Sequence, residues 1–257
     1  MKALIIGAGQ GKRLLPLTET TPKALIKIGG KSLFEWQLDA LAACGITEVV
    51  FVAGFNIDAI RKEGQRLSRK YNQVSLKIVH NPFHAIADNL ATCWTARGEM
   101  VNEFLLLNSD TIFSVPVLKT LLASASAPVT LAVDHKPRYD SDDMKVELDG
   151  TRLIDIGKTL EENKVNGESI GMLLFRDEGS RHFVHALESA MESETALKHW
   201  YLSVIATMAG KMRIETANIN GLDWCEVDYP HDIGIARNMI AGWRSTQDET
   251  LLSASTS

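Results

Sequence analysis

The sequence predicts an α/β fold, a three-layer sandwich with a mostly parallel, Rossmann-like central sheet. Short apolar runs typical of buried strands alternate with amphipathic helical patterns through the first half of the chain. The first run ends in glycine, as expected for a buried parallel strand that leads into a loop. The chain has 257 residues, of which 45% are hydrophobic and 23% charged, so it can bury a sizeable core.

In the first half, strand and helix patterns alternate strictly, which implies right-handed crossovers and helices on both faces of the sheet. Segment 32–45 carries leucines and a tryptophan at helical spacing, with Ser32 as a possible N-cap and Gly45 as a stop signal. The other segments follow from the same periodicities. The expected strands cover 2–9, 47–55, 74–81 and 103–110, and the expected helices cover 32–45, 56–71, 87–100 and 115–125.

The pattern changes after about residue 128, where strand-like runs follow one another directly. No Gly/Pro/Ser-rich linker intervenes, so we expect one domain over 1–244 with two halves, 1–127 and 128–244. Residues 245–257 are polar and are expected to form a frayed tail. The later expected strands are 128–136, 143–150, 152–158, 168–176, 212–219 and 223–228, and the later helices are 179–193, 199–210 and 229–244.

Charge and cysteine usage exclude several classes of protein. A net charge of −5 argues against a broad nucleic-acid footprint, which needs a basic surface. Cys44, Cys93 and Cys225 lie far apart without a Cys-x-x-Cys pair, which argues against a disulfide framework and a zinc knuckle. No apolar run approaches the ~20 residues of a membrane span. We therefore expect a cytoplasmic protein without nucleic-acid or membrane partners.

The first strand leads into a glycine loop, Gly-Ala-Gly-Gln-Gly-Lys-Arg-Leu at residues 7–14. The P-loop pattern G-x-x-x-x-G-K-[ST] fails because its second glycine would fall on Lys12. The dinucleotide pattern G-x-G-x-x-G fails at the same residue, and segment 20–34 lacks the acidic residue expected about 20 positions on. An NAD-dependent oxidoreductase is therefore disfavoured.

The loop does match G-x-G-x-G-x-R-L, followed by proline and by Pro-Lys-Ala-Leu at residues 22–25. In this it resembles the nucleotidylyltransferases of the sugar-phosphate type, and the resemblance extends over about residues 1–240. It implies a nucleotide-diphospho-sugar transferase fold and transfer of a nucleoside monophosphate to a phosphorylated small molecule, with release of pyrophosphate. Half 1–127 would bind the nucleotide and half 128–244 the acceptor.

The same resemblance implies roles for individual residues of the loop. Ala8, Gly9 and Gly11 would bind the nucleotide, because glycines let backbone N–H groups approach phosphates closely. Arg13 and Lys23 would act in catalysis by offsetting the charge on departing pyrophosphate. The alternative is a glycine-rich turn with solvated basic side chains.

Two aspartates are candidate ligands of Mg²⁺. Asp110 ends the expected strand 103–110, at an edge where open α/β sheets bind ligands, and Asp228 ends the strand 223–228. The resemblance implies that both hold Mg²⁺ against the triphosphate and that Ser109 contacts the nucleotide. The alternatives are that Asp110 caps a turn and that Asp228 is the N-cap of the final helix.

The second half resembles the acceptor side of the family. The resemblance implies that Lys145 acts in catalysis and that Lys158 and Glu168 bind the acceptor. Lys145 lies within an alternating run, and the other two lie at strand ends or loops, from which they could reach a ligand. Each of the three could equally be a solvated surface charge.

Residues 88–90, Asp-Asn-Leu, depart from the glycine-rich element of many sugar-1-phosphate enzymes. They are more similar to the asparagine-rich turn of the phosphocholine and aminoalkylphosphonate cytidylyltransferases. That similarity implies CTP as donor and a phosphorylated or phosphonate small molecule as acceptor. Asn89 could read the base because its amide both donates and accepts hydrogen bonds, although Asp88 and Asn89 could instead cap the following helix.

Two further alternatives and one expectation accompany this interpretation. A sugar-1-phosphate or cyclitol phosphate enzyme that uses another triphosphate would share the loop and the aspartates. A non-catalytic nucleotide-sugar sensor would share the scaffold, but it is disfavoured because the metal aspartates and Lys23 are all present. We also expect that the protein could form a homodimer.

Overall fold

The computed structural model describes the backbone of residues 1–124 and 127–254 and the side chains of residues 1–124 and 127–243. Strands from both halves of the chain form one nine-stranded sheet in the order β5-β4-β1-β6-β11-β8-β12-β10-β9. Its strands are β1 (Lys2–Gly7), β4 (Glu48–Ala53), β5 (Ser75–His80), β6 (Phe104–Asn108), β8 (Val129–Asp134), β9 (Lys145–Asp149), β10 (Arg152–Gly157), β11 (Gly167–Phe175) and β12 (Ile214–Asn218).

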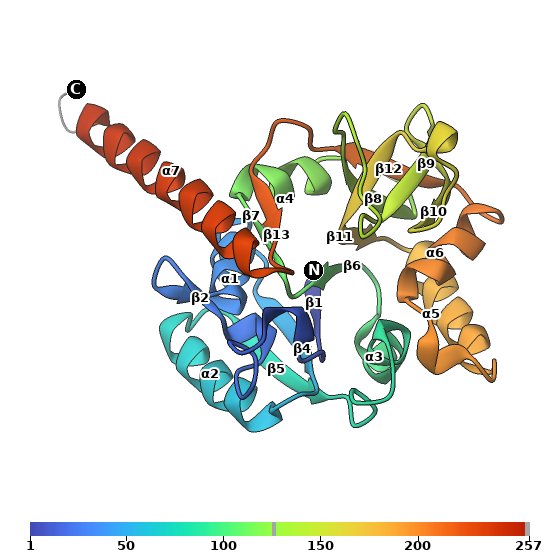
Figure 1. Ribbon diagram of the computed structural model, residues 1–257, viewed down its shortest axis with the longest axis horizontal. Coiled ribbons are helices and arrows are strands. Elements are labelled where there is room, and N and C mark those ends of the chain that lie inside the picture. Colours follow the sequence, from blue (N-terminus) through green and yellow to red (C-terminus); the bar gives the residue numbers. More distant parts are fainter. Residues whose placement is uncertain (125–126, 255–257) are drawn as a thin grey trace.

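Helices cover both faces of the sheet (Figure 1). Helices α1 (Leu33–Ala43), α2 (Ile57–Lys70) and α4 (Val115–Leu122) lie on one face, and α3 (Asn89–Thr95), α5 (Glu178–Met191) and α6 (Tyr201–Ala209) lie on the other. Short 3₁₀ turns are η1 (Lys12–Leu14), η2 (Lys23–Leu25), η3 (Arg97–Glu99), η4 (Glu162–Lys164) and η5 (Ala196–Lys198). The three-layer α/β architecture expected from the sequence is confirmed.

The expectation of a mostly parallel sheet is wrong. Strands β5, β4, β1 and β6 are parallel to one another, as is β12 to β8. The pairs β6–β11, β11–β8, β12–β10, β10–β9 and β9–β11 are antiparallel, so the sheet is mixed. The parallel part coincides with the strict strand–helix alternation. The antiparallel part arises where strand runs follow one another without a crossover helix.

Two small sheets complete the fold. Strand β2 (Lys27–Ile28) pairs with β3 (Lys31–Ser32), and β7 (Thr111–Phe113) pairs with β13 (Trp224–Glu226). Strand β7 directly follows β6, so the second small sheet joins the end of the central strand to the C-terminal part of the chain. This pairing brings residues near 110 and 228 together.

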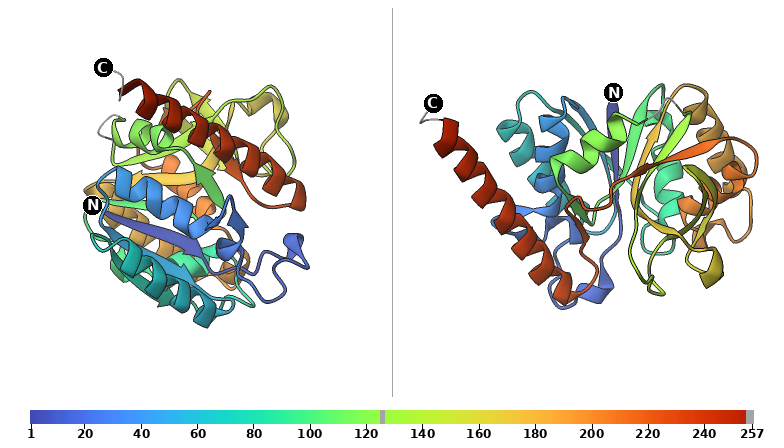
Figure 2. Two further views of the ribbon diagram at one scale, coloured as in Figure 1. Left: turned by 90° about the vertical axis from the view of Figure 1, so that its left-hand side faces the viewer. Right: turned by 90° about the horizontal axis from the view of Figure 1, so that it is seen from above.

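The final helix, α7 (Pro230–Ala254), is longer than the segment 229–244 predicted for it. It projects from the body of the protein (Figure 2). Segment 245–254, expected to fray, continues the helix, because it contains neither Gly nor Pro to stop helix propagation. Residues 255–257 lie outside the described part of the chain. Among the described helices, none is long and apolar enough to cross a membrane.

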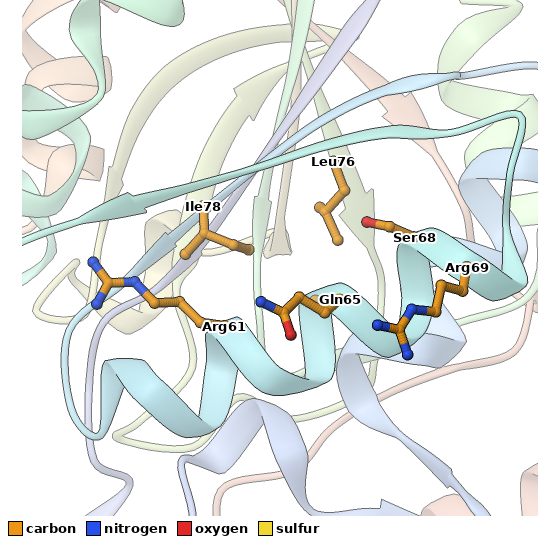
Figure 3. Close-up of a pocket in the computed structure, with 7 residues that line it drawn as sticks. Arg61, Gln65, Ser68, Arg69, Leu76 and Ile78 are labelled. Atoms are coloured by element: carbon orange, nitrogen blue, oxygen red, sulfur yellow. The ribbon is translucent and has the colours of Figure 1, made fainter.

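Strand β5 is an edge of the main sheet, and a groove of about 440 Å³ lies between it and α2 (Figure 3). Gly64 allows the close approach, since a Cβ there would lie 3.3 Å from Cδ1 of Ile78. Arg61 and Arg69 flank the groove. Lys77 adds a charge to the edge strand itself, which disfavours pairing with a strand of another molecule.

Strands from both halves share one aromatic core. The ring of Phe183 on α5 stacks on Phe175 of β11 at 4.5 Å between centroids, and Phe104 of β6 lies 6.4 Å away. Phe183 is fully buried. This cluster ties α5 to the junction between the parallel and antiparallel strands.

Replacing Phe183 with alanine should lower the free energy of unfolding by about 3–5 kcal/mol, because a large cavity would open in a close-packed core. Urea denaturation measures the change. Phe83→Ala is the matched control, since Phe83 is 42% exposed and its loss should cost no more than about 0.5 kcal/mol. Equal losses for both variants would contradict the assignment of this cluster to the core.

Candidate active site

The glycine loop and Asp110 meet at one edge of the sheet. The loop follows β1 and Asp110 follows β6, and these two strands are parallel neighbours. Their carboxyl ends therefore lie side by side, at the edge where open α/β sheets place ligands. Asp228 reaches the same place from the end of β13, where the N–H of Val227 donates to the carbonyl of Asp110 at 3.0 Å. Segments far apart in the sequence thus form one site.

At two positions of the glycine loop, the backbone leaves room for glycine alone. Gly11 has φ +77°, and a Cβ there would lie 2.9 Å from Cβ of Lys23. A Cβ at Gly7 would lie 2.8 Å from Cβ of Ser109. The hydroxyl of Thr18 donates to the carbonyl of Gly11 at 2.7 Å and braces the loop. A Cβ at Gly9, by contrast, would meet no protein atom within 4 Å, so Gly9 faces open space.

Lys23 is the central cation of the site. Its side chain is 11% exposed, and Nζ donates to Oδ2 of Asp110 at 2.8 Å and to Oδ1 of Asp228. Burial alone would lower the pKa of the Lys23 ammonium, but the two carboxylates outweigh that effect and raise the pKa above its usual value. Lys23 is therefore charged at any physiological pH.

Three carboxylates form a group that could hold a metal ion. One oxygen from each of Asp110, Glu226 and Asp228 lies within 4.8 Å of the others. Oδ1 of Asp110 is buried and has no hydrogen-bond partner among the described residues. Carboxylate oxygens are the ligands that Mg²⁺ prefers. Both the orphaned oxygen and the donor set therefore fit Mg²⁺.

Glu226 was missed in the sequence, although it lies two positions before Asp228 on an expected strand and so on the same side of that strand. Part of the Glu226 side chain is exposed to solvent, but protein atoms surround its carboxyl group. Desolvation of this carboxyl group, together with the nearby carboxylates of Asp110 and Asp228, raises the pKa of Glu226 to about 8. A cation at this place would relieve the repulsion.

The capping alternatives for the two aspartates are not observed. At the start of α7, the carboxylate of Asp232 accepts hydrogen bonds from the N–H groups of Asp228 and Tyr229 at 2.8 and 2.7 Å. Asp232 therefore satisfies these donors, as a carboxylate in the first turn of a helix commonly does. The carboxylates of Asp110 and Asp228 are directed to Lys23 instead.

Arg13 lies beside this group. Its guanidinium donates to Asp228 at 3.0 Å and to Asp142 at 3.2 Å, and it lies 5.2 Å from the ring centre of Tyr229. The side chain is 45% exposed. Arg13 therefore stands at the open side of the site, whereas Lys23 stands at its floor.

A cleft of about 250 Å³ adjoins the glycine loop. Its lining includes Ala8, Gly9, Asp88, Asn89, Ser109 and Trp200. The backbone N–H of Tyr201, the first residue of α6, donates to Oδ1 of Asn89 at 2.9 Å. This bond orients the amide, whose NH₂ group and second oxygen lone pair can still meet a ligand, so the role of Asn89 stays a prediction. The side chain of Asp88 makes no capping hydrogen bond at the start of α3.

Lys145, Lys158 and Glu168 do not line this cleft; they lie together in the antiparallel half. Lys145 is paired in register with Glu168 across β9 and β11. Its buried ammonium donates to the carbonyls of Asp140 and Lys158, at 2.5 and 3.1 Å. The ammonium of Lys158 lies 4.9 Å from the ring centre of Trp200, which does line the cleft. Lys158 is thus the member of this group nearest to the cleft.

A glycine loop and clustered carboxylates at the carboxyl edge of an α/β sheet define the class of α/β proteins that place a ligand site at that edge. The particular family follows from comparison. The chain belongs to the nucleotidyl transferase family, whose model matches residues 2–140. That match ends well before Asp228, so the place of Asp228 in the site rests on geometry.

Two relatives are similar to this chain in sequence, and one of them is a cytidylyltransferase, the class expected from residues 88–90. The chain is 28% identical over 241 residues to a bifunctional IPC transferase and DIPP synthase of Aquifex aeolicus, covering 93% of this chain and 51% of that protein. It is 31% identical over 113 residues to a choline-phosphate cytidylyltransferase of Streptococcus pneumoniae, covering 44% and 46%. The chain spans about half the length of these relatives.

Among solved structures, the inositol-1-phosphate CTP transferase from T. maritima is similar, with a TM-score of 0.79 at 18% sequence identity. The alignment covers 93% of this chain and 94% of that chain. The expected nucleotide-diphospho-sugar transferase type of fold is confirmed by this likeness.

Glu168 gives the site a measurable pH dependence. It is 4% exposed and pairs with Lys136 at 2.7 Å. Burial raises its pKa to about 7, Lys136 opposes the rise, and Asp143 and Asp134 add to it. Glu168 therefore keeps a proton in the folded protein between about pH 4.5 and 7 and loses it in the unfolded chain. The free energy of unfolding should fall as the pH rises through this window.

Glu168→Gln removes the titrating group. The free energy of unfolding of the variant minus that of the wild type should increase by about 1–3 kcal/mol as the pH rises from 5 to 8. The reason is that only the wild type must release a proton from position 168 in the folded state. Urea denaturation at several pH values measures the difference. Glu161→Gln, a change of the same kind at an exposed position, should show no such gain. A difference between Glu168→Gln and wild type that stays constant with pH would contradict this prediction.

Proposed function

We propose that the protein is a nucleotidylyltransferase that moves a nucleoside monophosphate from a triphosphate to a phosphorylated or phosphonate small molecule. The observation that carries this proposal is the position of Lys23. It bridges Asp110 and Asp228 directly below a glycine loop, at the carboxyl ends of β1 and β6. A fixed cation and paired carboxylates beside open backbone are the parts needed to bind Mg²⁺ and a triphosphate together.

The triphosphate binds along the glycine loop. Gly9 has open space where a side chain would stand, so N–H groups of residues 8–11 can approach phosphate oxygens. Lys23 donates to these oxygens from below and Arg13 from the open side of the site. Ser109 lines the same cleft. These donors are in place before the reaction, so they cost little reorganisation as charge develops.

Asp110 and Asp228 would hold Mg²⁺, and Glu226 lies close enough to offer a third carboxylate oxygen. When bound, the ion neutralises charge on the phosphates. Lys23 keeps both carboxylates oriented toward one point. The grouping of these residues in the fold supports the proposed dependence on Mg²⁺.

In the reaction, an oxygen of the acceptor phosphate or phosphonate forms a bond to the α-phosphorus, and the bond from that phosphorus to pyrophosphate breaks. The pair of electrons leaves with the pyrophosphate oxygen. Arg13 and Lys23 stabilise that charge by donating hydrogen bonds. No residue needs to form a covalent intermediate, so alignment and charge neutralisation account for the rate.

We propose CTP as the donor. The supporting relatives include a choline-phosphate cytidylyltransferase and a solved inositol-1-phosphate CTP transferase. The NH₂ group of Asn89 can donate to O2 or N3 of cytosine. Backbone carbonyls of the cleft and the carboxylate of Asp88, which lines it, are further candidate acceptors for the cytosine amino group.

The acceptor lies toward Lys158, Lys145 and Glu168. Lys158 would contact its phosphate, whereas the ammonium of Lys145 orders the carbonyls around Lys158. A hydroxyl-rich acceptor, such as a sugar-1-phosphate or cyclitol phosphate, is the second candidate, because Glu168 offers a buried carboxylate that hydroxyl groups could use. A homodimer stays a prediction from the sequence.

Asp110→Asn and Asp228→Asn should each lower Mg²⁺-dependent turnover by at least about 100-fold, which corresponds to about 2.7 kcal/mol of transition-state stabilisation. Melting temperatures without metal should stay within a few degrees of wild type, because each change removes carboxylate repulsion along with an ion pair. Pyrophosphate release and thermal unfolding measure the two effects. Asp149→Asn, an exposed change at the end of β9, is the control. Turnover that survives in Asp110→Asn would exclude the metal assignment.

A screen of ATP, CTP, GTP and UTP against phosphocholine, aminoethylphosphonate, inositol phosphate and sugar-1-phosphates tests the substrates. CTP should exceed UTP by about 10- to 100-fold in kcat/KM, because an unmet hydrogen bond in the base site costs about 1–3 kcal/mol. Equal or faster turnover with another triphosphate would overturn the choice of donor. A sugar-1-phosphate that outpaces the other acceptors would favour the second candidate. No pyrophosphate release with any pair would leave a nucleotide-sugar sensor as the better account.

A further inference from the structure

Asp142 connects the cations of the two substrate regions. It lies on the loop between β8 and β9, where residues 135–144 form no helix or strand. Its Oδ1 accepts a hydrogen bond from Arg13 at 3.2 Å and lies 3.6 Å from Nζ of Lys158. Its Oδ2 accepts from the hydroxyl of Tyr229 at 2.6 Å. Three groups that are distant in sequence therefore converge on one carboxylate.

We propose that Asp142 is an internal counter-anion, which occupies the place of a substrate phosphate between Arg13 and Lys158 and is displaced when substrate binds. This inference rests on the proposed function, since it takes Arg13 and Lys158 as the groups that meet the phosphates. Asp142 itself is not among the residues assigned to the triphosphate, the metal or the acceptor.

The contacts of Asp142 match those that a bound phosphate would make. A guanidinium, an ammonium and a hydroxyl are the usual donors to a phosphate oxygen. The Tyr229 hydroxyl, with Arg13 and Lys158, lowers the pKa of Asp142 below its usual value, so the carboxylate is charged whenever the cleft is free. The ring of Tyr229 lies against Arg13 and fixes the place where the two meet.

Displacement is feasible because these ion pairs are open to solvent. The side chains of Arg13 and Asp142 are 45% and 42% exposed, and exposed ion pairs are individually weak. Lys23 differs, because its ion pairs lie at the floor of the site. The ion pair between Asp142 and Arg13 can therefore break without disturbing the group formed by Lys23, Asp110 and Asp228.

The consequence is a competition at Arg13. In the ligand-free protein Arg13 is neutralised by Asp142 and Asp228 together. Mg²⁺ would engage Asp228 but has no ligand in Asp142, which is not part of the carboxylate group. A phosphate must therefore replace Asp142 directly, and Asp142 in turn helps to expel pyrophosphate after the reaction by taking Arg13 back.

The test is the affinity for inorganic pyrophosphate in the presence of Mg²⁺, measured by calorimetry on the full chain. Asp142→Asn should bind pyrophosphate about two- to fivefold more tightly than wild type, the range expected for removing an exposed competitor. The KM for the triphosphate should fall by a similar factor while kcat does not rise.

Asp140→Asn is the matched control. It removes the same charge from the same loop, but the Asp140 carboxylate makes no hydrogen bond or ion pair with any side chain or backbone that the structure describes. Its affinity for pyrophosphate should stay within about 1.5-fold of wild type, since the charge is solvated. Both variants remove one negative charge from the loop and so change the electrostatic potential alike. A difference in their affinities for pyrophosphate therefore reports the displacement of Asp142.

The sign of the effect is decisive. A residue that only orders the loop would give equal or weaker binding when it is removed, so such a result for Asp142→Asn would overturn the inference. An equal gain in Asp140→Asn would do the same. Failure of the proposed function is distinct: the wild-type protein would then release no pyrophosphate from any donor and acceptor pair, whatever the order of the three affinities.

Discussion

The ion pairs of Lys23 with Asp110 and Asp228 are the interaction on which the site depends. They draw together a turn after the glycine loop, the end of a central strand and the last strand of the chain. Removing Lys23 would leave two neighbouring carboxylates without their cation, a loss that typically costs about 3–5 kcal/mol in a buried set, whereas removing one carboxylate leaves Lys23 paired with the other. The aliphatic part of Lys23 also packs on Gly11, so the same side chain holds the loop in its positive-φ conformation.

Three cations of the site, Lys23, Arg13 and Lys158, are each matched by carboxylates in the ligand-free protein. Lys23 faces two, Arg13 faces two, and Lys158 faces Asp142 and the ring of Trp200. A highly charged anionic ligand therefore binds by replacing carboxylates as the partners of these cations, because the cations are not unpaired in the ligand-free protein. Such exchange costs less than desolvation of unpaired ions, and it keeps the empty site from attracting unrelated anions.

The sequence predicted the parts of the site that depend on local pattern. The glycine loop, Lys23 and Asp110 each lie at the end of a recognisable strand or in a short motif, and the structure brings them together. Glu226 was detectable in principle from its spacing to Asp228. Asp142 was not, because its position depends on contacts with Arg13, Lys158 and Tyr229, which are set by tertiary folding.

The same limit applies to the fold. Alternating strands and helices predicted the parallel half correctly, because each crossover is local. The insertion of β11 between β6 and β8 is a choice of strand order that periodicity does not encode. For Asn89, the residue was detectable but not the use of its carbonyl oxygen, which depends on the start of α6 lying beside it.

The pairing of β7 with β13 has a consequence for the order in which the protein is made. Strand β7 ends at Phe113, and its partner β13 begins only at Trp224, so β7 is synthesised well before β13 and Asp228. Until then Asp110 and Lys23 face each other without their third member, and β7 has an open edge. The nascent chain can build the parallel half of the sheet early, but the complete set of charges exists only once β13 and Asp228 have been synthesised.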